Sequence, residues 1–307
     1  MPSVEETAYP RLKSHPSPEA LETLYTPTDE EIALAKQTVR GDLPTVSFLA
    51  LLKTFQTVGY PIQLSEAPTS IIRRVIGSVD SQLTPQEVAS YDTARSRQRH
   101  VKAIRQYLEV KPFSDEARQV MLAAMETAIE TQYELVDLIN VALEELVKER
   151  YQLPAFSRLE RAAREVRAAH NNKLYQSVSD ALDGGEQMQL SELFYCAAGE
   201  TTTLWHEVKQ EPGSPKLGEL QSLVERLRWL QPLQLAGVAL WAMPEVKRIN
   251  FAAQAQALEA NQMKALPDAK RQTLAVALLQ RRYAQTLDDI ADVFIKRMRR
   301  MHYKAKE

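Results

Sequence analysis

Cysteine and glycine are both scarce in this chain of 307 residues, which has 9 glycines and a single cysteine, Cys196. One cysteine excludes an internal disulfide and is typical of proteins from a reducing compartment. It stands in the segment SELFYCAAG, and we expect it to be a small core residue. Because glycine is rare and Ala, Leu, Glu, Gln and Arg recur, the composition favours helices over sheets.

Long apolar runs and known catalytic motifs are also missing. No apolar stretch reaches the roughly 18 residues of a membrane span, and the acidic N-terminus MPSVEETAYP is not a signal peptide. We therefore expect a cytoplasmic protein without a membrane partner. No Walker loop, GxSxG, HExxH or paired cysteine ligands occur, so we expect no cofactor, metal or catalytic residue on this chain.

What the chain does contain is the composition of a soluble globular protein, with 44% hydrophobic and 25% charged residues. Its length leaves room for two or three domains. The formal net charge is only −2, yet the stretch RSRQRHVKAIRQYLEVKPF at 95–113 holds six Lys or Arg residues against one acid. Charge segregated in this way indicates a surface that meets a polyanion, or a solvated helix face.

Capping residues and apolar spacing predict an all-α fold throughout. Thr28, Thr84 and Ser114 each precede an acidic turn and predict helix starts. The segment Gly184-Gly185 predicts a hinge, and prolines at 232, 244 and 267 predict later breaks. We expect an N-terminal arm at 1–27, a first helical DNA-binding module at 28–112, a second at 113–183, and a further helical region at 184–307.

A faint repeat at an offset of 91 residues connects the first two modules. It aligns Leu52 with Leu143, Tyr60 with Tyr151 and Arg73 with Arg164. Each copy predicts an apolar helix, a connector with Tyr and Pro, and a second, basic helix, the second copy running from Ser157 to about His170. This is the plan of a helix-turn-helix DNA reader, and equally that of a purely structural helical hairpin.

The helical faces select candidate DNA-binding residues. Apolar side chains of each second helix share one face, suited to packing, and arginines lie on the opposite face, where Arg can bind guanine in two-pronged fashion. The basic stretch at 95–111 is expected to contact phosphates. The candidates are Ser70, Arg73, Arg74, Arg95, Arg97, Arg99, Lys102, Arg105, Arg158, Arg161, Arg164, Arg167 and Lys173.

Two other groups of residues have simpler interpretations. Asp288, Asp289 and Asp292 would lie in the first turn of a final helix that begins near Thr286, where the helix dipole favours acids without any metal. Trp205, Trp229 and Trp241 are expected in the core.

Four stretches resemble the N-terminal half of the Tn-three family of replicative transposases. They are FLALLKTFQTVGYPIQLSEAP, RSRQRHVKAIRQYLEVKPF, LPAFSRLERAAREV and DDIADVFIKRMRRMHYKAKE, in the family's order across 48–307. The resemblance implies tandem modules that bind the terminal inverted repeats of a transposon. It also implies a helical region for self-association, here 184–307, and a separate RNase H-like catalytic domain with divalent metal beyond the last motif. We therefore expect a DNA-binding chain without catalytic activity.

Alternatives remain open at this stage. One is an all-helical scaffold or oligomerisation protein in which the arginines only keep the surface soluble. Another is a stand-alone regulator that competes with full-length transposase for the transposon ends. RNA binding is disfavoured, because the basic segments lack the interleaved aromatics and the sheet platform of many single-strand readers.

Overall fold

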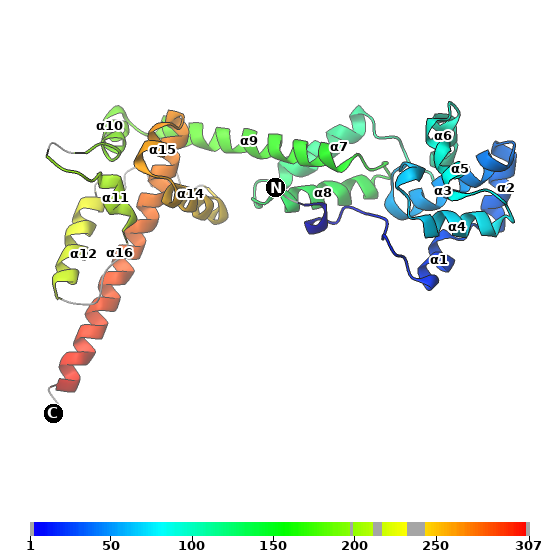
Figure 1. Ribbon diagram of the computed structural model, residues 1–307. Coiled ribbons are helices and arrows are strands. Elements are labelled where there is room, and N and C mark those ends of the chain that lie inside the picture. Colours follow the sequence, from blue (N-terminus) through cyan, green and yellow to red (C-terminus); the bar gives the residue numbers. More distant parts are fainter. Residues whose placement is uncertain (1–2, 197–198, 211–216, 232–242, 305–307) are drawn as a thin grey trace. The chain divides into compact units, whose positions relative to one another are not determined.

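The computed structural model describes residues 3–196, 199–210, 217–231 and 243–304 (Figure 1). Regular structure in these ranges is helical, apart from isolated β-bridges such as that between Lys111 and Tyr151. The predicted all-α fold class is therefore confirmed. The chain forms two compact units, Met1–Ile129 with Glu134–Val166, and Glu130–Tyr133 with Arg167–Glu307.

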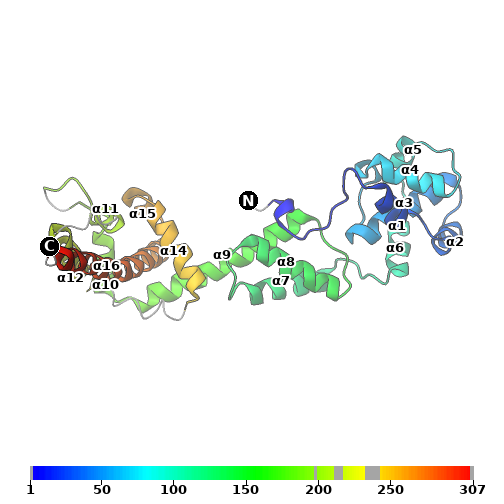
Figure 2. The same ribbon diagram turned by 90° about the horizontal axis from the view of Figure 1, so that it is seen from below.

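The first unit begins with six helices, five of which are grouped around the buried helix α3 (Figure 2). They are α1 Pro18–Tyr25, α2 Asp29–Thr38, α3 Asp42–Val58, α4 Thr69–Ser78, α5 Pro85–Ser90 and α6 Arg97–Tyr107. Every residue of α3 from Val46 to Phe55 is buried, as expected of a helix that is enclosed on all sides. Ile72 and Val75 of α4 and Ile104 of α6 pack in the same core, so α3 holds the surrounding helices in place.

The first unit also contains a second core. It is formed by α7 Asp115–Ala128, α8 Leu135–Lys148 and the start of α9 Phe156–Ala181. Met121 and Met125 of α7 pack with Leu138 of α8 and Leu159 of α9. One core therefore lies within 28–112 and the other mainly within 113–166, and the division of the chain into DNA-binding modules stays a prediction.

The three predicted helix starts are confirmed in their hydrogen bonds. The hydroxyl of Thr28 accepts from the amide of Glu31 at 3.3 Å, and that of Thr84 accepts from Glu87 at 3.3 Å. Ser114 caps α7 in the same way. Local capping chemistry is thus enough to place the beginnings of α2, α5 and α7.

Two predicted helix boundaries are wrong. Helix α9 continues past His170 to Ala181, and α16 spans Asp268–Lys304 instead of beginning near Thr286. Neither segment contains Gly or Pro, so nothing stops the helix. Asp288 and Asp289 consequently lie in the middle of α16, and the helix dipole does not account for them. Asp292 pairs instead with Lys296 one turn later, at 3.6 Å.

The second unit contains the remaining helices around one core. They are α10 Gly184–Glu192, α11 Leu204–Lys209, α12 Leu217–Leu230, α14 Glu245–Ala257, α15 Ala260–Lys264 and α16. Trp205 is fully buried, as predicted, and its indole donates to the Leu258 carbonyl at 2.9 Å. The chain turns at Asp183, which caps α10, and both glycines of the predicted hinge lie inside that helix.

The predictions for single residues of the second unit have different outcomes. Cys196 is exposed, so the prediction that it is a core residue is wrong. Trp229 is partly buried against the core, as expected. Pro232 and Trp241 lie outside the described residues.

Candidate nucleic-acid interface

The predicted repeat is visible in the backbone of the first unit. The first helix of each copy ends in a left-handed residue, Gly59 at φ 75° and Arg150 at φ 57°, and these two residues are 91 positions apart. Each is followed by a tyrosine and a connector that leads to the second helix. A Cβ at Gly59 would lie 3.3 Å from Leu153 Cδ1, so this position favours glycine both for its φ and for its close contact.

The apolar faces predicted for both second helices are confirmed. Ile71, Ile72, Val75 and Ile76 of α4 are buried, as are Leu159, Ala162, Ala163 and Val166 of α9. The opposite faces therefore point away from the cores. Helical geometry of this kind is shared by DNA readers and structural hairpins, so the helix-turn-helix assignment remains a prediction.

Only one of the three candidates on α4 is exposed. Arg73 lies on the surface, and Ser70 is half-buried. Arg74 is also half-buried, because its Nε donates to the hydroxyl of Thr26 at 2.7 Å. That bond connects α4 to the end of α1, which gives Arg74 a structural role.

Some cations of the basic stretch are exposed, and others are hydrogen bonded inside the protein. Arg95, Arg99 and Lys102 are exposed, and within the described residues none of them has a hydrogen-bonded or ion-paired side-chain partner. Helix α6 begins at Arg97, two residues later than the stretch itself. The three exposed cations of the stretch, of which Arg99 and Lys102 lie on α6, are available to meet a polyanion from solvent.

Arg97 is engaged inside the protein. Its Nη2 donates to the Ile62 carbonyl at 2.6 Å, and its Nε lies 3.6 Å from Asp92 Oδ1. Asp92 in turn accepts from the amides of Leu64 and Ser65. The Arg97 side chain is 16% exposed, so this arginine fastens the connector before α4 to the start of α6.

The other end of α6 is fastened to the second repeat. Arg105 Nη1 donates to Gln152 Oε1 at 3.2 Å. Lys111 forms a parallel bridge, in which its amide donates to the Arg150 carbonyl and its carbonyl accepts from the Gln152 amide, each at 2.8 Å. The Leu153 amide donates to the Gly59 carbonyl at 3.0 Å. The connectors of both repeats and the basic stretch thus form one framework.

A buried histidine supports α6 from the inside. His100 is 4% exposed, and its Nδ1 is hydrogen bonded to the hydroxyl of Tyr91. Burial, with a smaller contribution from the charge of Arg99, lowers the pKa of His100. This histidine is therefore a neutral packing residue near neutral pH.

The candidates on α9 fall in both units. Arg158 and Arg161 are exposed, and Arg164 is half-buried with an ion pair to Glu160. These three lie in the first unit. Arg167 and Lys173 belong to the second unit, where the Arg167 guanidinium lies 5.5 Å from the centre of the Tyr133 ring and Lys173 is exposed.

The N-terminal segment packs on both repeats, which was not predicted from the sequence. Tyr9 is 7% exposed, its hydroxyl donates to the Pro154 carbonyl at 2.9 Å, and its ring contacts those of Tyr60 and Phe156. Burial raises the pKa of Tyr9. An aromatic residue among prolines was the available signal, and we had assigned it to an arm.

The described residues contain neither a membrane-spanning helix nor a metal-binding cluster. In those ranges no helix combines the length and the apolar character needed to cross a membrane. The same ranges contain no group of three or more His, Cys, Asp or Glu side chains able to hold a metal ion.

Arg97 and Arg99 make a matched pair for separating structure from surface charge. We expect Arg97→Ala to lower the free energy of unfolding by about 1–3 kcal/mol, because it leaves the Ile62 carbonyl and Asp92 without their cation. Arg99→Ala should change it by less than about 0.5 kcal/mol, as is usual at an exposed position. Urea unfolding of both variants measures the difference, and equal effects would contradict the assignment.

Comparison with known proteins places the chain in a family. Residues 1–166 match a family model described as "Domain of unknown function (DUF4158)". The transposase for transposon Tn501 of Pseudomonas aeruginosa is 28% identical over 273 residues, which is 88% of this chain and 27% of that protein. Escherichia coli transposases for Tn3926 and Tn21 are 24% and 20% identical, covering 70% and 92% of this chain and 22% and 28% of their own length.

The chain therefore spans about a quarter of the length of these relatives. The family model covers more than half of the chain. This protein belongs to the DUF4158 family and is related in sequence to transposases of the Tn-three family.

Proposed function

We propose that this protein binds double-stranded DNA sequence-specifically, at the terminal inverted repeats of a transposon. The observation that carries the proposal is the exposure of Arg99 and Lys102 on a helix that Arg105 and Lys111 fasten to the connector of the second repeat. Cations that extend into solvent from a helix held in this way suit a polyanion. The names of the relatives support a role in transposition.

The exposed cations have two different roles in this proposal. Arg95, Arg99 and Lys102 neutralise phosphates and position the protein on the duplex. Arg73 on α4 and Arg158 and Arg161 on α9 face away from their cores and reach base edges in the major groove. We place this binding in the bacterial cytoplasm, and the proposal assigns these residues no catalytic step, cofactor or metal.

The phosphate role predicts a change in salt dependence. The double variant Arg99→Ala, Lys102→Ala should flatten the slope of log affinity against log salt by roughly two units, because two fewer counterions are released. Fluorescence anisotropy with an inverted-repeat duplex at several salt concentrations measures the slope. A lost preference for the repeat with an unchanged slope would show that these residues read bases.

The base-reading role predicts a loss of discrimination at α9. We expect Arg161→Ala to cost about 1–3 kcal/mol of binding free energy on the inverted repeat and to relax selectivity at one base step. Competition between repeat and random duplexes measures this. Arg118, an exposed arginine on α7, supplies the control Arg118→Ala. If neither variant alters DNA retention, the arginines serve only for solubility and the scaffold alternative is correct.

A second role, self-association through 184–307, is favoured by one surface of α16. Leu287, Phe294, Met298 and Met301 are 44%, 55%, 50% and 57% exposed. With Ala291 they follow the alternating spacing of four and three residues typical of a coiled-coil seam. We expect the chain to associate at micromolar concentration and Phe294→Glu to weaken association. A wild-type chain that sediments as a monomer would contradict this role.

A further inference from the structure

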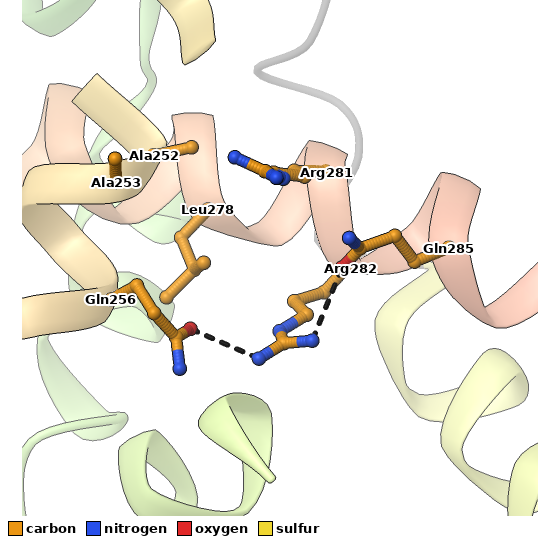
Figure 3. Close-up of a pocket in the computed structure, with 7 residues that line it drawn as sticks. All are labelled: Ala252, Ala253, Gln256, Leu278, Arg281, Arg282 and Gln285. Atoms are coloured by element: carbon orange, nitrogen blue, oxygen red, sulfur yellow. Dashed lines mark hydrogen bonds between the residues drawn. The ribbon is translucent and has the colours of Figure 1, made fainter. Parts of the chain in front are cut away.

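The second unit contains a cavity of about 290 Å³ between α14 and α16 (Figure 3). Ala252 and Gln256 of α14 line one side, and Leu278, Arg281, Arg282 and Gln285 of α16 line the other. The residues from α16 recur at intervals of three and four, so they share the face of the helix that is turned to α14. Alanine opposite this face leaves room that a larger side chain would fill.

Arg282 is a fixed part of the wall. It is 9% exposed, and its Nη2 donates to the Lys209 carbonyl at 2.7 Å and to Gln256 Oε1 at 3.0 Å. Its Nη1 donates to Gln285 Oε1 at 3.1 Å. The Lys209 carbonyl lies at the end of α11, where the negative end of the helix suits a guanidinium. A positive charge is therefore held beside the cavity at a defined place.

Arg281 lies on the same wall of the cavity, and its environment is the opposite of that of Arg282. It is exposed, and within the described ranges its guanidinium has neither an ion pair nor a hydrogen bond. Gln285 follows one helical turn later. Because its Oε1 accepts from Arg282, its amide NH₂ group remains as a donor. The lining supplies these donors and two guanidinium charges and contains no carboxylate.

We propose that this cavity binds a phosphate group, with Arg281 and the Gln285 amide as donors and Arg282 as the fixed positive charge beside them. The forked guanidinium of Arg281 matches two phosphate oxygens. A backbone phosphodiester of duplex DNA is one source of that group, and this source rests on the proposed DNA binding. Free inorganic phosphate has the same chemistry and is the other source.

Thermal unfolding of the full chain tests the site without DNA. A ligand that binds only the folded state raises Tm, so inorganic phosphate should raise Tm relative to chloride at equal ionic strength. Arg281→Ala should abolish that rise. Arg228→Ala removes an exposed arginine of α12 outside the cavity and should keep it. Arg282 is unsuitable for substitution because it holds α11, α14 and α16 together.

A DNA titration distinguishes the sources. If the ligand is a phosphodiester, Arg281→Ala should flatten the salt slope by about one unit, while Arg228→Ala leaves it unchanged. Loss of the phosphate-induced Tm rise with an unchanged slope supports the site with free phosphate as its ligand. If Arg281→Ala matches Arg228→Ala in both assays, the proposal is overturned. Equal wild-type affinity for repeat and random duplexes would instead contradict the proposed function, and the Tm assay would still report on the cavity.

Discussion

The connector between α8 and α9 is the point on which the arrangement of the first unit depends. Three segments distant in sequence are fastened to main-chain atoms of this connector: the Gly59 carbonyl accepts from it, both backbone groups of Lys111 pair with it, and the Tyr9 hydroxyl donates to its Pro154 carbonyl. A main-chain hydrogen bond is kept through most side-chain changes, and an unpaired buried amide is costly. The relation between the two repeats therefore relies on backbone pairing as well as on side-chain packing.

Within that framework, two of the cations of the basic stretch, Arg97 and Arg105, have a structural role. The guanidinium group of Arg97 binds Ile62 and Asp92, and that of Arg105 binds Gln152. Arg97 reaches Ile62 across 35 positions in sequence, and Arg105 reaches Gln152 across 47. The charge of Arg105 still adds to the local potential, since its acceptor Gln152 is neutral, whereas that of Arg97 is offset by Asp92. Exposed Arg99 and Lys102 therefore stand on a helix whose two ends are held by cations of the same stretch.

The sequence predicted what is decided within one or two helical turns. Thr28, Thr84 and Ser114 cap helices through residues three positions away, and the apolar faces of α4 and α9 follow from helical spacing. Contacts between distant segments were not predictable in this way. Nothing local distinguishes Arg97, which is bound to Ile62, from Arg99, and nothing near Tyr9 indicates Pro154. The end of α9 was missed because Asn171 and Asn172 resemble a C-cap, while the packing of Tyr175 and Val178 in the core of the second unit carries the helix onward.

The two arginine pairs show how one helix separates like residues by position. Successive residues on a helix differ by about 100° in direction, so one of two adjacent arginines turns inward when its neighbour faces solvent. Arg282 is inward and meets carbonyl oxygens, and Arg281 is outward beside the same cavity. Arg97 and Arg99, two positions apart, differ in the same way: Arg97 is turned inward and Arg99 faces solvent.

An inward arginine needs several acceptors in a plane, which lysine with its single ammonium group does not match. At the outward positions any positive charge can bind a phosphate. Arginine is required there only where the side chain must form a bidentate contact with two phosphate oxygens or with a base edge. Replacement by lysine therefore distinguishes the two kinds of arginine more sharply than removal of the side chain does.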